Sequence, residues 1–215
     1  MMLLDVGCGD GASLTGQAEY CVGIDIAEAE LRRAKEKFPG FGFVLGDVQR
    51  LPFREGVFDT ALCSHIIEHV HQPKQLLQEL HRVMKRGGLL ELEFPNGFSL
   101  LEYVNRLFGA IGWSGYMHLH RFSPKNVHQL LKGAGWVIID VQSFAWLGPV
   151  IDSIYFHLRW ALSKDPDRTS QRYQKARIEE INRFLIRKWV GGVDRALVRA
   201  FPSRSAVVAI MAKRA

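Results

Sequence analysis

The feature that most constrains this chain is an apolar run leading into three alternating glycines, Leu3-Leu4-Asp5-Val6-Gly7-Cys8-Gly9-Asp10-Gly11. A short apolar run that ends in glycines is typical of a buried strand. Glycine at every second position favours a loop with positive φ angles, in which a ligand can lie against the backbone amides. The pattern predicts a strand, a ligand-binding loop and a helix; the simpler alternative is a tight strand-to-helix turn without a ligand.

A dinucleotide site is a second alternative for this loop. Gly7-x-Gly9-x-x-Ala12 satisfies the G-x-G-x-x-G/A fingerprint, and Asp25 follows at about the distance at which an acidic residue binds a ribose. Two features argue against a pyrophosphate: Asp5 places a carboxylate in the lead-in to the loop, and Gly16 weakens the helix that follows. The residues downstream have to decide between these interpretations.

Strand-like apolar runs alternate with helical patterns as far as residue 143. The expected strands cover residues 3–6, 21–25, 41–45, 58–63, 89–94 and 136–141, and the clearest helices cover residues 27–37, 73–85 (closed by Arg86-Gly87-Gly88) and 124–133. Such alternation predicts an α/β fold with a parallel sheet and helices on both faces. Ligands of such sheets bind at the carboxyl ends of the strands, where Gly7–Gly11, Asp25, Asp47 and Ser64 fall.

The C-terminal part of the chain breaks this alternation. Residues 145–203 follow a helical pattern, and a β-branched run at 206–211 then predicts a last strand. We expect a single domain over residues 1–215, with a cofactor-binding core at 1–143, a helical insertion at 145–203 and a final strand at 205–213. Residues 159–215 carry a net charge of +9 within a chain of +6, which indicates either an anionic partner or a solvated helical face.

Composition limits the cellular setting of the protein. The three cysteines are scattered without metal-ligand spacing, which predicts free thiols in a reducing compartment. The sequence has no apolar run of about 18 residues and no basic leader, so we expect neither a membrane-spanning helix nor a signal peptide. A cytoplasmic location follows from these patterns.

Six further motifs follow the glycine loop, in this order: Gly23-Ile24-Asp25, Gly46-Asp47-Val48, Leu51-Pro52-Phe53, Ile67-Glu68-His69-Val70, Lys85-Arg86-Gly87-Gly88 and Phe94-Pro95-Asn96. Together they resemble the class I S-adenosylmethionine-dependent methyltransferases, in particular the small-molecule branch that includes ubiquinone-type O-methyltransferases. The resemblance covers residues 2–143 and disfavours a dehydrogenase. It implies a Rossmann-like sheet of seven mostly parallel strands, with an antiparallel last strand after a helical insertion.

The resemblance also implies which residues bind S-adenosylmethionine: Asp5, Gly7, Gly9, Gly11, Asp25, Ile26, Asp47, Val48 and Ser64. The glycine loop would pack against the methionine part, with Asp5 near its ammonium group. Asp25 would accept both ribose hydroxyls, and Ile26 would lie against the adenine. Asp47 and the Val48 amide would bind the adenine edge, and Ser64 would border the methyl donor.

Histidines are the candidates for a general base if the acceptor is a hydroxyl. We expect His65, His69 and His120 to be catalytic, and His118 is a further candidate in the same segment as His120. Some members of the broader family hold a divalent metal with a Glu-x-x-Glu-His motif. Here His65 replaces the first Glu, so the prediction is that no metal is bound. A structural role for Glu68 and His69, with His65 facing the pocket, is the alternative to a catalytic His69.

The expected reaction is methyl transfer to a small molecule, on a hydroxyl oxygen. Residues 98–113 and 145–203 would form the acceptor pocket, and residues 149–200 would contact a membrane surface if the acceptor is lipid-like. One alternative is a nucleic-acid methyltransferase that uses the basic C-terminal segment, although no base-methylation motif or nucleic-acid-binding module supports it. Another is a cofactor-binding protein without catalysis. The oligomeric state is left open.

Overall fold

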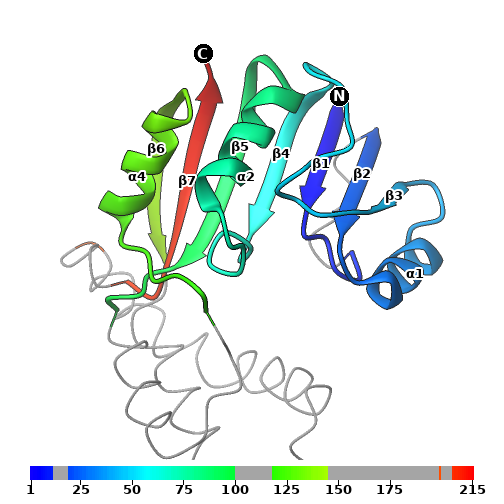
Figure 1. Cartoon of the computed structure of the whole chain (residues 1–215), viewed down its shortest axis with the longest axis horizontal. Coiled ribbons are helices and arrows are strands. Elements are labelled where there is room, and N and C mark those ends of the chain that lie inside the picture. The colour runs from blue at the N-terminus through cyan, green and yellow to red at the C-terminus, as the bar shows by residue number, and fades with distance from the viewer. Residues whose placement is uncertain (12–18, 100–117, 145–198, 200–204) are drawn as a thin grey trace, which may run out of the picture. The chain divides into compact units, whose positions relative to one another are not determined.

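The computed structural model describes residues 1–11, 19–99, 118–144, 199 and 205–215, which contain a seven-stranded sheet (Figure 1). The strand order is β3-β2-β1-β4-β5-β7-β6. The strands are β1 (Met2–Val6), β2 (Tyr20–Asp25), β3 (Gly42–Leu45), β4 (Phe58–Ser64), β5 (Met84–Pro95), β6 (Trp136–Phe144) and β7 (Val207–Arg214). The helices are α1 (Glu28–Lys37), α2 (Pro73–Val83) and α4 (Pro124–Gly133).

The register of the central strands brings their carboxyl ends to one edge of the sheet. Val6 of β1 lies between Ile24 of β2 and Cys63 of β4, and Asp25 pairs with Leu45 of β3, all in parallel. Strand β7 runs in the opposite direction between β5 and β6 (Figure 1). This is the predicted α/β architecture of seven mostly parallel strands with an antiparallel last strand, and the structure confirms it.

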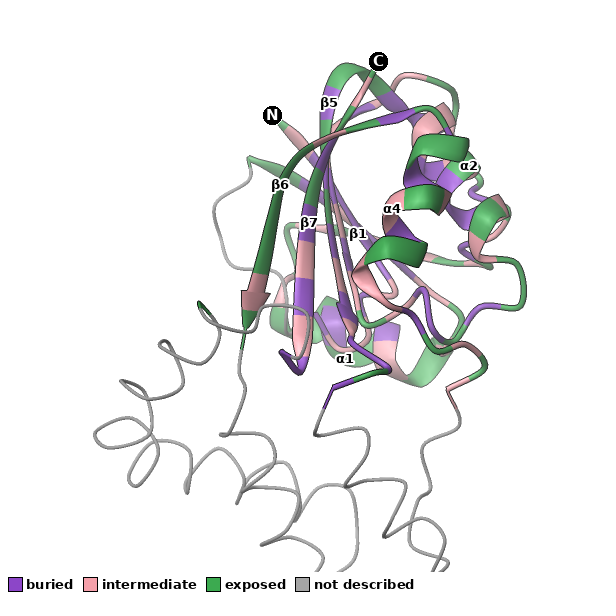
Figure 2. Ribbon diagram, turned by 90° about the vertical axis from the view of Figure 1, so that its left-hand side faces the viewer, coloured by how far each residue is buried: buried purple, intermediate pink, exposed green. Residues whose placement is uncertain are grey.

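The core lies between the sheet and the helices α2 and α4, which cover the same face of the sheet (Figure 2). The predicted apolar face of α2 is fully buried against the strands, through Leu76, Leu77, Leu80 and Val83. Trp136, at the start of β6, donates its indole N–H to the carbonyl oxygen of Leu77 at 3.0 Å. The hydrophobic effect and this hydrogen bond together fix α2 on the sheet.

The end of α2 is the clearest correction to the predicted elements. The pattern predicts a helix to residue 85 closed by Arg86-Gly87-Gly88, whereas α2 ends at Val83 and β5 begins at Met84. The amide of Val57 donates to the carbonyl oxygen of Val83 at 2.7 Å, and Met84 pairs with Phe58 of β4. The residues after Val83 therefore pair with β4 as a strand, although the helical sequence pattern continues to residue 85. The register shift between Phe58 and Thr60 accommodates the extra residues, with Gly87 at φ 77°.

Contacts within the chain group into two compact units. The first comprises Met1–Pro95, His118–Gln142 and Val208–Ala215, and the second comprises Asn96–Met117 and Ser143–Val207. The predicted helix before β2, the helical insertion at 145–203 and most of 98–113 lie outside the described residues, so the domain and pocket assignments made there stay predictions. Within the described part of the chain, no helix has the length and apolar character that crossing a membrane requires.

The cysteines agree with the expectation of free thiols. Cys8, Cys21 and Cys63 are buried and unpaired in disulfides within the described residues. Burial raises the pKa of Cys8 to about 12 and that of Cys21 to about 11, with the Asp5 carboxylate adding to both shifts. These thiols therefore stay protonated and act as small apolar side chains.

Candidate cofactor and catalytic site

The glycine loop after β1 has the backbone that its sequence predicts. Gly7, Gly9 and Gly11 have φ angles of 70°, 51° and 80°, which side chains with a Cβ rarely adopt. The amides of Gly7 and Cys8 both donate to the carbonyl oxygen of Ile24, at 2.8 and 3.1 Å. A Cβ on Gly7 would lie 2.0 Å from Cδ1 of Ile66, whereas a Cβ on Gly9 would meet no atom of the described residues within 4 Å. Gly7 therefore allows close packing against Ile66, and Gly9 has no close neighbour for a side chain among the described residues.

Asp25 joins the glycine loop to the start of α1. One carboxylate oxygen accepts from the amide of Gly9 at 2.8 Å, and the other accepts from the amide of Ala27 at 2.8 Å. Each oxygen retains a lone pair for a further donor, such as a ribose hydroxyl. The carbonyl oxygen of Asp25 also accepts from the amide of Gly46, at 3.0 Å, which places the loop after β3 next to the glycine loop.

Asp5 is a buried carboxylate that is incompletely satisfied. The residue is 1% exposed, and its Oδ2 has no hydrogen-bond partner among the described residues. Burial, with a smaller contribution from Asp25, raises the pKa of Asp5 to about 6. An ammonium group placed against this oxygen would compensate the buried charge, which is the role that the family resemblance implies for Asp5.

The ends of β2 and β3 present an apolar side chain and a carboxylate. Ile26 is 78% exposed, which is unusual for a large aliphatic residue and leaves a surface on which a flat ring can lie. Asp47 is exposed, and its carboxylate accepts from the backbone amide of Gln49 at 2.8 Å. The Val48 side chain packs in the core, so only its backbone is left for a ligand. Gln49 anchors this loop to the first turn of α2 by accepting from the amide of Gln72 at 2.8 Å.

Ser64 and His65 follow at the end of β4, where they contact Glu93 of β5. Ser64 donates its hydroxyl to Glu93 Oε2 at 2.8 Å. His65 has a positive φ of 55°, and its ring lies between two carboxylates: Nδ1 is 3.4 Å from Glu68 Oε1, and Nε2 is 3.6 Å from Glu93 Oε1. Glu68, and then Glu93, raise the pKa of His65 to about 9. His65 is therefore a cation at neutral pH and is poorly suited to start as a general base.

Glu68 brings the loop after β4 together with the segment before α4. Its carbonyl oxygen accepts from the amides of Leu119 and His120, at 2.9 and 3.2 Å. Its carboxylate is 1% exposed, and neither oxygen has a hydrogen-bond partner among the described residues. His69 and His118 contact each other with ring centroids 5.1 Å apart. His118 thus joins His69 and Glu68, although the two histidines are 49 positions apart in the sequence.

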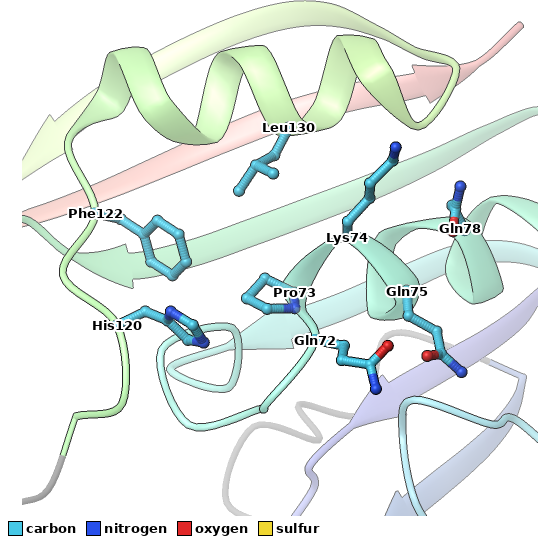
Figure 3. A pocket seen from close by; sticks show the side chains of 8 residues that line it. All are labelled: Gln72, Pro73, Lys74, Gln75, Gln78, His120, Phe122 and Leu130. Atoms are coloured by element: carbon cyan, nitrogen blue, oxygen red, sulfur yellow. The ribbon is translucent and has the colours of Figure 1, made fainter.

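His120 lines a groove between α2 and α4 with a volume of about 590 Å³ (Figure 3). The groove is lined by Gln72, Pro73, Lys74, Gln75, Gln78, His120, Phe122 and Leu130. The His120 ring stacks on Phe122 with centroids 5.6 Å apart, and Ser123 begins α4 directly afterwards. The structure thus places His120 in a different environment from His65 and His69.

Glu93 is the residue of this site that the sequence analysis did not single out. It lies in β5, two positions before Pro95, and its pKa is lowered by His65 and by the hydroxyl of Ser64. Alternation along 89–94 could have placed Glu91 and Glu93 on the same face of that strand. No sequence pattern, however, tells which histidine such a carboxylate will face.

Comparison with known proteins shows the family to which this chain belongs. The family described as "Methyltransferase domain" matches residues 4–92. An uncharacterized methyltransferase of Mycobacterium sp. (strain KMS) is 32% identical over 168 residues, which cover 74% of this chain and 67% of that protein. The chain belongs to the class I S-adenosylmethionine-dependent methyltransferases. The sequence resemblance is therefore confirmed at the level of the family.

Further relatives show how much of this chain is similar to known proteins. The demethylmenaquinone methyltransferase of Protochlamydia amoebophila is 35% identical over 139 residues, which cover 53% of this chain but only 57% of that protein. Other relatives carry names as different as a biotin-biosynthesis protein and a probable 18S rRNA methyltransferase. A solved methyltransferase structure from Bacillus halodurans has 16% identity and a TM-score of 0.63, covering 99% of this chain and 92% of that one, which shows the shared fold.

The site residues fit the family's cofactor, S-adenosylmethionine. Asp5 offers an unpartnered buried carboxylate, Gly9 an accessible backbone and Asp25 a two-oxygen acceptor, at the adjacent ends of β1 and β2. Ile26 and Asp47 add the exposed apolar surface and the further acceptor expected for an adenine. The predicted cofactor residues are thus brought together at one sheet edge, and their individual roles stay predictions.

Proposed function

We propose that this methyltransferase transfers a methyl group from S-adenosylmethionine to a hydroxyl oxygen of a small-molecule acceptor. The cofactor supplies an activated methyl group on a sulfonium, so the protein has to hold the acceptor in line and exclude water. The observation that carries the acceptor half of the proposal is the group of histidines just past β4 and before α4, at the edge of the sheet where the cofactor residues meet.

The roles divide according to environment. Asp5, Asp25 and the glycine loop bind the cofactor, and Ser64 borders the methyl donor. His65, held as a cation between Glu68 and Glu93, donates hydrogen bonds and balances negative charge at the acceptor. His69, about 40% exposed, and His120, in the groove between α2 and α4, are the candidates to take the acceptor's proton. The name of the Protochlamydia relative supports a small, quinone-like acceptor.

The first experiment is calorimetric titration of the full chain with S-adenosylmethionine and S-adenosylhomocysteine. We expect binding that Asp25→Ala abolishes, because that change removes both acceptor oxygens at the end of β2. Asp140→Ala, an exposed carboxylate on β6, is the matched control and should bind as the wild type does. Absence of binding to the wild type would contradict the cofactor half of the proposal.

A methyl-transfer screen then tests the acceptor half. Labelled cofactor is supplied with phenolic alcohols, lipid-like hydroxyl compounds and RNA, and the methylated product is identified by mass spectrometry. We expect O-methylation of a small molecule, with His120→Ala lowering kcat while cofactor affinity is retained. Methylated RNA would support the nucleic-acid alternative, and cofactor binding without turnover on any acceptor would support the non-catalytic one.

A further inference from the structure

A second, chemically different cluster adjoins the cofactor site. Glu68, His69 and His118 each offer one ligand atom, and these three atoms lie within 4.8 Å of one another. One carboxylate and two imidazoles form a donor set that first-row divalent metals such as Zn²⁺ take in proteins. The sequence argued against a metal because His65 stands where a metal-binding motif would have glutamate; it could not show that His118 comes in from a distant segment.

The buried carboxylate of Glu68 is the second observation that indicates a ligand. Both of its oxygens are buried without a hydrogen bond from the described residues, and the residue is only 1% exposed. His65 Nδ1 and His69 Nε2 approach the same oxygen, Oε1, at 3.4 and 4.0 Å, so the His65 contact is a long ion pair and the His69 contact is longer still. The His65 imidazolium balances part of this buried charge from 3.4 Å, and a metal ion would supply the direct ligation that the two oxygens lack among the described residues.

The backbone holds these ligands on a prepared frame. The Leu119 and His120 amides bind the carbonyl oxygen of Glu68, so the segment that carries His118 is fastened to the residue that supplies the carboxylate. The amide of His69 closes a turn onto the carbonyl oxygen of Ile66 at 2.9 Å. Tetrahedral ligand atoms around Zn²⁺ lie about 3.4 Å apart, given Zn–N and Zn–O distances of about 2.0–2.1 Å. Glu68 Oε1 and His69 Nε2 are 4.0 Å apart, so these two atoms would have to approach each other by about 0.6 Å to share a tetrahedral ion.

We propose that Glu68, His69 and His118 bind a divalent transition-metal ion, with Zn²⁺ as the best match to the donor set. Three protein ligands leave a coordination position open, as in catalytic rather than structural zinc sites. His69 is exposed and His118 is half-buried, so the cluster can be reached from solvent. The metal's role, which rests on the proposed function, would be to ligate the acceptor hydroxyl and lower its pKa. His69 would then serve as a ligand, which leaves His120 as the candidate to take the acceptor's proton.

Metal binding is tested with the full-length chain in the absence of cofactor and acceptor. The chain, freed of any affinity tag and treated with chelator, is titrated with Co²⁺, whose visible absorption reports coordination, and then with Zn²⁺ in competition. We expect one equivalent of Co²⁺ per chain, displaced by Zn²⁺. The affinity should fall at least ten-fold in His69→Ala, His118→Ala and Glu68→Gln, and a saturating metal concentration should raise the Tm of the wild type but not of these variants.

The control variant is His71→Ala, because His71 is an exposed histidine two positions from His69 and outside the cluster. It should bind Co²⁺ as the wild type does. The proposal is overturned if the wild type binds no more Co²⁺ than His118→Ala, or if Glu68→Gln, folded by circular dichroism, keeps full affinity. The latter result would leave Glu68 as a counter-ion for His65. Since cofactor binding is measured separately, failure of the metal site and failure of the proposed methyl transfer are distinguishable.

Discussion

At the scale of single residues, Asp5 shows a conflict between stability and binding. Its pKa of about 6 exceeds the ordinary value of 3.8, so the folded state holds this proton more tightly than the unfolded state does. The free energy of unfolding of the cofactor-free protein should therefore fall as the pH rises from about 4 to about 6. Above that range, the cost of the buried charge is present in full.

Asp5→Asn removes this cost while keeping the shape of the side chain. We expect the cofactor-free variant to be more stable than the wild type at pH 7.5, by up to about 3 kcal/mol, because a pKa difference of about two units is worth that much. The gain should vanish near pH 4, and the affinity for S-adenosylmethionine should fall about ten-fold with the loss of a charge opposite the ammonium group. Denaturant unfolding at the two pH values and calorimetry measure these effects.

The exposed carboxylate of Glu91 on β5 provides the control for Asp5. Glu91→Gln should leave both the stability at pH 7.5 and the cofactor affinity close to those of the wild type. Equal or lower stability of Asp5→Asn at pH 7.5 would contradict the assignment of Asp5 as a strained buried charge.

Two glycines in the same loop should respond differently to alanine. Gly9→Ala places a Cβ where none of the described residues has an atom within 4 Å, so we expect the positive φ to set its cost, at about 1–2 kcal/mol. Gly7→Ala adds a collision with Ile66 and should cost more, part of which the additional change Ile66→Ala recovers. Denaturant unfolding of the four variants, including Ile66→Ala alone, measures the coupling; equal effects of Gly7→Ala and Gly9→Ala would contradict it.

At the scale of elements, the start of α4 positions the histidines that precede it. Ser123 accepts from the amide of Asn126 at 3.2 Å, and the Asn126 side chain accepts from the amide of Ser123 at 3.2 Å. This reciprocal cap satisfies amides that an uncapped helix leaves open. Because His118 and His120 come within five residues before Ser123, the cap also fixes the point at which their segment enters the helix.

Ser123→Ala should lower the free energy of unfolding by about 1 kcal/mol, because it removes the side-chain acceptor of the cap. Lys125→Ala in the same turn is the control. The Lys125 side chain is exposed and outside the cap, so the stability of this variant should stay close to that of the wild type. Thermal and denaturant unfolding provide the measurement. An equal effect of the two changes would show that the capping box does not stabilise α4.

At the scale of the whole molecule, Arg214 ties the last strand to the junction between α2 and β5. Its guanidinium donates to the carbonyl oxygen of Arg82 at 3.2 Å and to that of Met84, and it pairs with Glu55 at 2.9 Å. The Arg214 side chain is 11% exposed, whereas that of Glu55 is 69% exposed. The hydrogen bonds from Arg214 to the two carbonyl oxygens are therefore less exposed to solvent than its ion pair with Glu55.

Arg214→Met should lower the free energy of unfolding by about 1.5–3 kcal/mol, the usual worth of a hydrogen bond made by a charged group. Glu55→Gln is the matched change on the exposed side, where solvent screens the ion pair, and its effect should be much smaller. Denaturant unfolding of both variants decides between them. A larger effect of Glu55→Gln would mean that the ion pair, and not the backbone contacts, holds the end of β7.

Several features of the fold could be predicted because they depend on local chemistry. The alternation of apolar runs and helical patterns specified the parallel sheet, and the glycines with Asp5, Asp25 and Asp47 specified its functional edge. These signals are readable because β-strands, glycine loops and strand-end carboxylates are short-range features. The predicted boundary between α2 and β5 was wrong because Met84 pairs with β4, a strand that lies about 25 residues earlier in the chain.

The sequence by itself determined the family, the layers of the fold and the residues at the cofactor edge of the sheet. Only the tertiary structure decided which carboxylates the histidines face: Glu68 and Glu93 around His65, and Glu68 beside His69 and His118. The physical reason is that a hydrogen bond or an ion pair depends on distances of a few ångströms between segments that folding brings together. Residue spacing along the chain carries no record of those distances.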